Sequence, residues 1–339
     1  MGFFNECSYV IRKSNKDMIL IKSENGLRYK YFKNSNLIVH SESITLVPID
    51  FSNYYFDIDS NDNVYGIFLD SKINILKLNN DSNKFLTLHT IDYDSENYTI
   101  TFPYIKFINN TIHIFYYLTN KDCATTILFH HYNNGKQWFE NKVDFINLPV
   151  LDNFTIYFNE KVPTIFYFKE NNEFPQVYCT NFNLSNLSWN DPICITNSLE
   201  NKIYLSVLKD KLNFYHITYC ESNDFKYSIK YLNGYLNNNS FDESVNKFIT
   251  DGSLYLYPSI LKYNSSIFIS YVHKNILYTC YSDDLGCSWS ESYEDEFSIN
   301  DKFIRACFKS NYLSDKDYVS TNVFVSKDPF GILGNFYNW

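Results

Sequence analysis

The sequence predicts an all-β protein, a seven-bladed β-propeller built of four-stranded antiparallel blades. Three observations carry this prediction: a composition that favours strands, a strand unit that recurs about every fifty residues, and a turn motif at a fixed place in that unit. Six blades followed by an irregular end is the alternative that the same pattern allows. We expect the whole chain, residues 1–339, to form this single domain.

Composition points to strands rather than helices. The chain holds 31 Tyr and 30 Phe, and 45% of its residues are hydrophobic, so it has ample material for a buried core. Aromatic and β-branched residues suit a pleated, half-buried surface, and this content excludes global disorder. The abundance of Asn, Lys, Ile, Tyr and Phe is also what an AT-rich genome, such as that of many bacteria, encodes. It therefore carries no functional meaning by itself.

A four-stranded unit is clearest between residues 257 and 294. Short runs of β-branched and aromatic residues alternate there with Asn, Ser and Asp turns, as in an antiparallel meander. The runs are Pro258–Tyr263, Ile267–His273, Ile276–Ser282 and a fourth that begins near Trp289. A second copy has runs at 54–59, 64–69, 73–78 and 85–89, and a third copy begins with runs at 102–107 and 112–117.

The first strands of these units recur at a regular spacing of about 45 to 54 residues, which is typical of propeller blades. They begin near Tyr9, Tyr54, Phe102, Phe154, Ile203, Tyr257 and Phe303. The last unit lacks a fourth strand, whereas the segment Gly2–Cys7 precedes the first unit and has no partner there. Pairing this N-terminal strand with the last blade would remove an exposed sheet edge and close the propeller.

A turn motif follows the third strand of the sixth unit. It fits the pattern S-x-D-x-G-x-x-W through Ser282, Asp284, Gly286 and Trp289. Ser and Asp side chains accept hydrogen bonds from turn amides, Gly permits a positive φ, and Trp can pack into the blade. A degenerate copy in the third unit retains Asn133, Gly135 and Trp138.

This motif resembles the Asp-box, or BNR repeat, of sialidase-like propellers. The resemblance implies a structural turn that lies away from the channel mouth, so we expect these residues to stabilise blades. The family also implies three arginines that grip a carboxylate, a Tyr nucleophile with a Glu beside it, and an Asp acid/base. The chain has only Arg12, Arg28 and Arg305, and none lies in a Tyr/Phe-Arg-Ile-Pro motif. It lacks the sialidase catalytic pattern, and we expect no sialidase activity.

Two arginines and two aspartates are the candidate ligand-binding residues. Arg12 and Arg305 lie in predicted first strands of neighbouring blades, which line the central channel. Asp57 and Asp59 alternate onto one face of the next first strand. The guanidinium pair could hold an anionic ligand bidentately. The alternative is that these charges pair across the channel wall and keep it hydrated.

Charge and motifs exclude several classes of function. The net charge is −9 and no Lys/Arg block occurs, so nucleic acid and anionic membranes are not expected as partners. No signal peptide or membrane-spanning run is visible, and eight scattered cysteines form no C-x-x-C pair, so we expect a cytoplasmic protein with reduced thiols. His113, His216 and His273 fall in second strands of different blades, so we predict no metal site. No phosphate-binding loop or nucleophile motif predicts a cofactor or a catalytic residue.

The sequence favours a non-catalytic recognition scaffold that binds a protein or glycan through loops at one end of the channel. The alternative is a carbohydrate-active enzyme, a glycosidase or lyase, that uses carboxylates at the channel mouth. A close pair of carboxylates in a deep pocket would favour the enzyme, and a flat aromatic face would favour the scaffold. The residues indicate neither the identity of the ligand nor an oligomeric state.

Overall fold

The computed structural model describes residues 7–123, 125–150, 153–223, 226–237, 240–320, 322–327 and 330–334. Over these residues almost all regular structure is β-strand, which confirms the predicted all-β class. The helical elements are short: α1 (Glu296–Asn300) and the 3-10 turns η1 (Phe51–Asn53) and η2 (Leu313–Asp315). The chain forms two compact units. Unit 1 is Met1–Asn147 with Cys307–Lys316, and unit 2 is Leu148–Ala306 with Asp317–Trp339.

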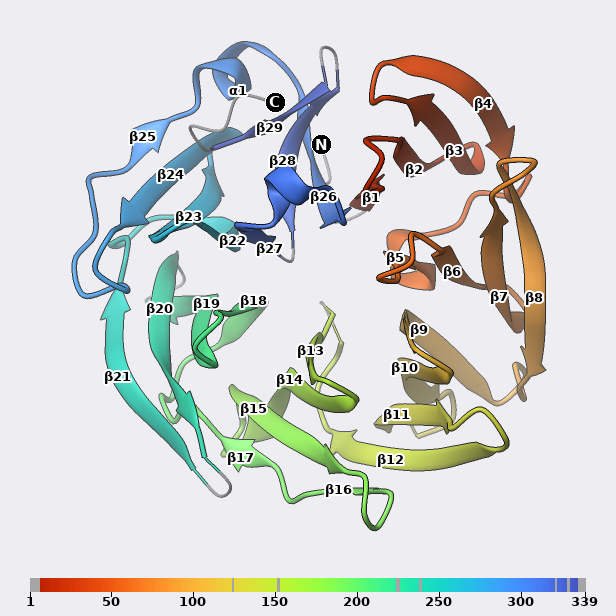
Figure 1. Cartoon of the computed structure of the whole chain (residues 1–339). Helices are drawn as coiled ribbons and strands as arrows, with labels where there is room; N and C mark the ends of the chain where they lie inside the picture. Colours follow the sequence, from red (N-terminus) through yellow and green to blue (C-terminus); the bar gives the residue numbers. More distant parts are fainter. Residues whose placement is uncertain are drawn as a thin grey trace. The chain divides into compact units, whose positions relative to one another are not determined.

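Unit 1 contains antiparallel meanders of four consecutive strands, coloured from red to yellow in Figure 1. The first comprises β1 (Cys7–Arg12), β2 (Met18–Glu24), β3 (Gly26–Lys33) and β4 (Leu37–Ser43). The second comprises β5 (Tyr54–Ile58), β6 (Val64–Leu69), β7 (Lys72–Asn79) and β8 (Lys84–Asp92). The third comprises β9 (Tyr98–Ile108), β10 (Thr111–Asn120), β11 (Thr126–Asn133) and β12 (Trp138–Ile146).

Unit 2 repeats the same plan. Its first meander comprises β13 (Thr155–Asn159), β14 (Val162–Asn171), β15 (Phe174–Asn183) and β16 (Ser188–Trp189), and β17 (Ile193–Cys194) also pairs with β15. The next comprises β18 (Lys202–Lys209), β19 (Phe214–Asn223), β20 (Lys226–Leu236) and β21 (Phe241–Phe248). The third comprises β22 (Leu256–Tyr263), β23 (Ser266–His273), β24 (Ile276–Ser282) and β25 (Tyr293–Glu294), and β27 (Tyr318–Ser320) pairs with β22.

Strand β26 (Phe303–Ser310) contributes to both units. Its first four residues pair with β28 (Val323–Lys327) in unit 2, and β29 (Phe330–Leu333) pairs with β28 in turn. Its remaining residues belong to unit 1, and β26 lies next to β1 in the hydrogen-bonded strand order. The hydrogen-bonded strand order runs from β29 through β28, β26 and β1 to β4 as one sheet. This sheet combines the first and last predicted units, so the division into sheets does not confirm seven separate blades. The predicted closing strand, Gly2–Cys7, lies outside the described residues except for Cys7, which begins β1.

Burial explains why the first strands were recognisable in the sequence. Every residue of β5 is buried, because both faces of this strand are packed. None of the residues of β8, the last strand of the same meander, is buried. Strands that are buried on both faces appear in a sequence as continuous apolar and aromatic runs. Each predicted first strand accordingly overlaps an observed one, and the predicted starts lie within four residues of the observed starts: β1, β5, β9, β13, β18, β22 and β26.

Irregular backbone in three first strands was not predicted. Phe102, Tyr204 and Tyr257 have positive φ angles of 52°, 59° and 56°. Bulky residues rarely adopt this conformation. In each case the pairing register with the second strand shifts beside the residue, as in a β-bulge. The rings of Tyr204 and Tyr257 lie 4.5 Å apart in unit 2, and this packing helps to hold the strained backbone of both residues.

Candidate functional site

Arg12 lies at the end of β1 and forms an ion pair with Asp315. Its Nη1 atom is 3.2 Å from Oδ1 and 3.3 Å from Oδ2 of Asp315, whose side chain is only 1% exposed. Ser310 donates a second hydrogen bond, of 2.5 Å, to Oδ2 of this carboxylate. The guanidinium carbon of Arg12 also lies 4.4 Å from the ring centre of Tyr312. A buried carboxylate therefore fixes the position of the guanidinium against an aromatic ring.

Tyr312 is flanked by a second cation. The Nζ atom of Lys16 lies 5.3 Å from the centre of the Tyr312 ring. Hydrogen bonds from the side chains of Ser314 and Lys16, together with the charges of Lys16 and Arg12, lower the pKa of the Tyr312 phenol. A phenol with a lowered pKa, in a half-buried position between two cations, is a candidate general base. We call Arg12, Lys16, Tyr312 and Asp315 the Arg12 cluster.

The loop after β5 packs beside the Arg12 cluster within unit 1. Nδ2 of Asn311 donates to the backbone oxygen of Asp59 and, at 2.8 Å, to Oδ1 of Asp62. Ser14 donates to the Asp62 carboxylate through both its amide and its hydroxyl group. Burial acts to raise the pKa of Asp62, but these hydrogen bonds lower it overall. Asp62 is thus held as a carboxylate, which is unsuited to the role of a general acid.

Asp57 and Asp59, the predicted ligand-binding aspartates, both have partners within the protein. The Asp57 side chain is buried, and its Oδ2 atom is 2.7 Å from Nζ of Lys106. The carboxylate of Asp59 accepts hydrogen bonds from the amides of Asn61 and Asn63 in its own turn. These contacts correspond to the alternative in which the charges pair inside the protein. A direct role for Asp57 and Asp59 in ligand binding stays a prediction.

Arg305 lies in the part of β26 that belongs to unit 2, opposite Phe324 of β28. Arg12 belongs to unit 1, so the structure does not test whether the two arginines share a ligand. The Arg12 cluster instead came from residues that the sequence analysis missed, namely Lys16, Tyr312 and Asp315. No local signal could have found them, because Tyr, Lys and Asp are common in this chain and Asp315 is 303 positions from Arg12.

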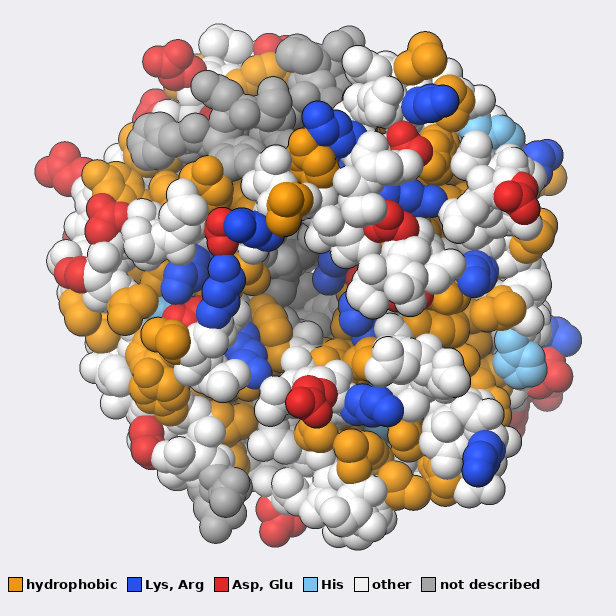
Figure 2. Space-filling view, in the orientation of Figure 1, with side chains coloured by type: hydrophobic (Ala, Val, Ile, Leu, Met, Phe, Trp, Pro, Cys, Tyr) orange, Lys and Arg blue, Asp and Glu red, His pale blue; other side chains and the backbone are white. Residues whose placement is uncertain are grey.

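Further basic side chains come from the ends of the first strands of unit 1. Lys106, near the end of β9, lies beside Asp57, and Lys309 of β26 lies over the ring of Tyr55, with its Nζ atom 5.8 Å from the ring centre. Lys13 follows β1 and donates to Asn80. Figure 2 shows blue Lys and Arg side chains beside red carboxylates over strands β1 to β9, in the right half of the view. Unit 1 of this acidic protein therefore carries several cations besides Arg12 and Lys16.

The turn from Ser282 to Trp289 has the predicted place and internal contacts. It follows β24 and precedes β25. The Ser282 hydroxyl accepts a bond from the amide of Gly286, the Asp284 carboxylate accepts bonds from the amide and hydroxyl of Ser288, and the Trp289 indole donates to the Gly286 carbonyl. These bonds, from Ser288 above all, lower the pKa of Asp284 to about 2. In the degenerate copy, Asn133 accepts from the amide of Gly135, and Trp138 is 36% exposed.

The turn also binds the neighbouring meander of unit 2. The hydroxyl of Tyr231 and the amide of Asn233, both on β20, donate to the Leu285 carbonyl. The Tyr231 hydroxyl also lies 2.7 Å from Nδ1 of His216, and Asp210 lies on the other side of this imidazole. These side chains are buried, so the network stabilises the contact between the two meanders rather than presenting groups to a ligand.

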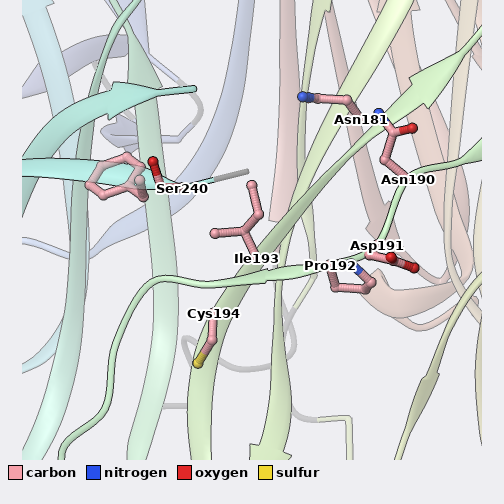
Figure 3. A pocket seen from close by; sticks show the side chains of 8 residues that line it. Asn181, Asn190, Asp191, Pro192, Ile193, Cys194 and Ser240 are labelled. Carbon is pink, nitrogen blue, oxygen red and sulfur yellow. The ribbon is translucent and has the colours of Figure 1, made fainter. Parts of the chain in front are cut away.

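Unit 2 has an open pocket of about 880 Å³ at the outer strands of its first two meanders. Figure 3 shows the side chains of Asn181, Asn190 and Asp191 with Ile193 and Ser240 around it. Its lining residues are Asn181, Asn190, Asp191, Pro192, Ile193, Cys194, Ser240 and Phe241. This lining contains a single carboxylate and no cation or His, so it offers fewer groups for proton transfer than the Arg12 cluster.

Histidines come together as a pair but not as a metal site. Nδ1 of His113 on β10 is 3.1 Å from Nε2 of His130 on β11, and both rings are buried. The sequence analysis placed His113, His216 and His273 in second strands, and they lie in β10, β19 and β23. Among the residues that the structure describes, no three His, Cys, Asp or Glu side chains are grouped as metal ligands. No described helix is long and apolar enough to cross a membrane.

No protein-family model and no curated protein matches this sequence. Solved structures do match. The polysaccharide lyase Uly1 has a TM-score of 0.50 and 8% identity, and the match covers 85% of this chain and 81% of that one. The α-L-arabinofuranosidase Arb93A of Fusarium graminearum, in complex with an iminosugar inhibitor, has a TM-score of 0.49 and 11% identity over 83% of this chain and 99% of that one. The endo-arabinase of Bacteroides thetaiotaomicron VPI-5482 has a TM-score of 0.40 and 11% identity over 66% and 89% of the two chains.

The likeness to Uly1 supports a β-propeller type of fold for this chain. The matched structures also correct the main functional prediction. The sequence favoured a non-catalytic recognition scaffold, whereas the match with a TM-score of 0.50 is a polysaccharide lyase. The scaffold prediction is therefore wrong on this comparison, and the findings favour its alternative, a carbohydrate-active enzyme.

Proposed function

We propose that this protein is a carbohydrate-active enzyme that cleaves an acidic polysaccharide at the Arg12 cluster. The observation that carries the proposal is the position of Tyr312 between Arg12 and Lys16, where two cations and hydrogen bonds lower the pKa of its phenol. The enzymes among the matched structures support the general class of activity. The charges around the site support an anionic sugar, such as a uronate, as the unit that is recognised.

The residues of the Arg12 cluster suit a β-elimination. The planar guanidinium of Arg12, held in place by Asp315, has the donor geometry that matches a carboxylate. Pairing of Arg12 with the carboxylate of a uronate would neutralise its charge and acidify the proton on the adjacent carbon. The Tyr312 phenolate would accept that proton, and the C–H electrons would form a C=C bond as the glycosidic C–O bond breaks. The ammonium group of Lys16 would then protonate the departing oxygen.

The carboxylates of unit 1 suit a glycosidase less well. Glycoside hydrolysis needs a protonated carboxyl group and a second carboxylate roughly 5 to 9 Å from it. Asp315 and Asp57 are ion-paired with Arg12 and Lys106, and the pKa of Asp62 is lowered. Carboxylates that are engaged by partners inside the protein are poorly placed to act as a general acid or as a nucleophile. We therefore favour a lyase over a glycosidase.

Cleavage of uronate-containing polysaccharides by the purified full chain tests this proposal. A lyase forms an unsaturated product that absorbs ultraviolet light, whereas a glycosidase releases reducing ends without this absorbance. We expect the absorbance to rise in the wild type and to be lost in Tyr312→Phe, which retains the ring but lacks the hydroxyl. Tyr235→Phe, at a 45% exposed tyrosine of β20, is the matched control and should keep full activity.

The pH profile tests the proton transfer separately. Activity should rise with pH as the Tyr312 phenol ionises. Lys16→Gln removes a hydrogen bond and a charge that lower the pKa of this phenol, so the rising limb should move to higher pH. Cleavage that is equally fast in Tyr312→Phe and Tyr235→Phe would refute the site. Cleavage without ultraviolet absorbance would refute the lyase chemistry.

We further propose the finer features of the fold that the sequence predicts. These are seven blades in one domain, closure by the N-terminal strand, and an Asp-box role for the Ser282–Trp289 turn. We also propose that Arg305 binds an anionic ligand, as the sequence predicts. An experimental structure with six blades would contradict the blade count. An Arg305→Gln variant with an unchanged KM would contradict the role of this arginine.

A further inference from the structure

Two cysteines from opposite ends of the sequence lie in contact within unit 1. Cys7 is the first residue of β1, and Cys307 lies in β26, 300 positions later. Their Sγ atoms are 3.6 Å apart. We propose that Cys7 and Cys307 are a modification site, a thiol pair that a small disulfide oxidant converts into a disulfide between the two strands.

The backbone around the pair already suits a disulfide. Strands β26 and β1 are neighbours in the hydrogen-bonded order. Neighbouring strands lie about 4.7–4.9 Å apart and the two Sγ atoms are already 3.6 Å apart, so the Cα separation of about 4.4–6.8 Å that disulfides adopt is within reach. A bond of about 2.05 Å requires the sulfur atoms to approach by roughly 1.5 Å, which small rotations of the side chains can supply. Bond formation therefore requires no rearrangement of the strands.

One of the two thiols, that of Cys307, is accessible to an oxidant in solution. Cys307 is half-buried, whereas Cys7 is 8% exposed. Buried thiols elsewhere are poorly suited to this reaction, since burial raises the pKa of Cys179 and Cys280 to about 12. Cys287 is exposed and can react with an oxidant, whereas it is Cys7 and Cys307 whose sulfur atoms lie in contact. The short distance between the two sulfur atoms therefore favours an internal disulfide as the product at Cys7 and Cys307, rather than a lasting adduct with the oxidant.

The reaction balances with a glutathione-type disulfide as the oxidant. The more accessible Cys307 thiolate attacks one sulfur of this reagent, forms a mixed disulfide and releases the first thiol. Cys7 then attacks the Cys307 sulfur of the mixed disulfide and releases the second thiol. Two protein thiols and one small disulfide thus give one protein disulfide and two small thiols. The two protons of the protein thiols leave with these products.

The product would tie the first strand of the chain to the strand that returns near its end. Such a link closes a loop of about 300 residues and restricts the unfolded chain, so it should stabilise the folded state in a way that a reductant reverses. The native strands need no change for this effect. Redox conditions would then set the stability of unit 1 without altering the residues of the Arg12 cluster.

Mass spectrometry of the full chain after treatment with oxidised glutathione tests the proposal. Digestion without reduction should yield a cross-linked peptide pair that contains Cys7 and Cys307. Cys7→Ser should lose this product and stop at a glutathione adduct on Cys307. Cys194→Ser, which removes an exposed cysteine of β17, is the matched control and should keep the cross-link.

A melting-temperature measurement provides a second readout. Oxidised wild type and oxidised Cys194→Ser should melt at a higher temperature than their reduced forms, and the rise should be absent in Cys7→Ser. The proposal would be overturned if the treated wild type kept both Cys7 and Cys307 alkylatable while exposed cysteines became glutathionylated. It would also be overturned if the cross-linked peptides joined other cysteines. Neither result depends on whether the chain cleaves polysaccharides.

Discussion

Replacement of Gly286 by alanine should destabilise the protein through two separable effects. Gly286 has a φ of +87°, a conformation that costs an L-residue about 1–2 kcal/mol. An added Cβ would also lie 2.3 Å from ring and hydroxyl atoms of Tyr231. Overpacking of this kind typically costs about 1–3 kcal/mol. We therefore expect Gly286→Ala to lower the free energy of unfolding by about 2–5 kcal/mol.

Tyr231 cannot move away cheaply from the new methyl group. Its side chain is fully buried, and its hydroxyl contacts Nδ1 of His216 at 2.7 Å and the Leu285 carbonyl at 3.2 Å. Displacement of the ring would break these hydrogen bonds and leave buried polar groups unsatisfied, which is more costly than a shift of an apolar side chain. The clash should therefore appear in full as a loss of stability.

Gly252→Ala is the matched control for the backbone effect. Gly252 also has a positive φ, of +57°, but an added Cβ there would meet no atom within 4 Å. Urea-induced unfolding of both variants should show a loss of about 1–2 kcal/mol for Gly252→Ala and a further loss of about 1–3 kcal/mol for Gly286→Ala. Equal losses in the two variants would refute the packing of the turn against Tyr231. Loss of polysaccharide cleavage by folded Gly286→Ala would refute a purely structural role for the turn.

Three further predictions concern buried polar groups. Glu221→Gln should cost about 3–5 kcal/mol in urea-induced unfolding, because it leaves the buried Lys202 ammonium without its carboxylate partner, whereas Asp92→Asn at an exposed pair should leave stability unchanged within error. Burial lowers the pKa of His113 to about 3, so the unfolded chain binds the extra proton first, and stability should fall as the pH drops from about 6.5 toward 3. Chemical denaturation across this range should show a shallower fall in His113→Phe, and an unchanged slope would contradict the assignment. Tyr231→Phe should cost about 1–3 kcal/mol by the same measurement, since it removes a buried hydroxyl with three partners, and a neutral result would exclude a contribution from this network.

The sequence by itself determined the features that depend on local patterns. The continuous apolar and aromatic runs of the first strands arise because both faces of strands such as β5 are buried. The turn at Ser282–Trp289 was predictable because its hydrogen bonds join residues that lie at most four positions apart. Strand boundaries and turn contacts of this kind follow from a few neighbouring side chains.

Only the tertiary structure decided which distant residues meet. The contact between Arg12 and Asp315 and that between Cys7 and Cys307 join positions 303 and 300 residues apart. Strand periodicity predicts which residues of a strand face inward, but it does not predict which strand of another meander packs against those residues. The positive φ of Tyr204 is likewise a product of packing, since an isolated tyrosine avoids this conformation. The sequence named Arg12 as a candidate, but it could not show that Tyr312 and Asp315, which follow β26, contact this arginine, because no local pattern specifies that packing.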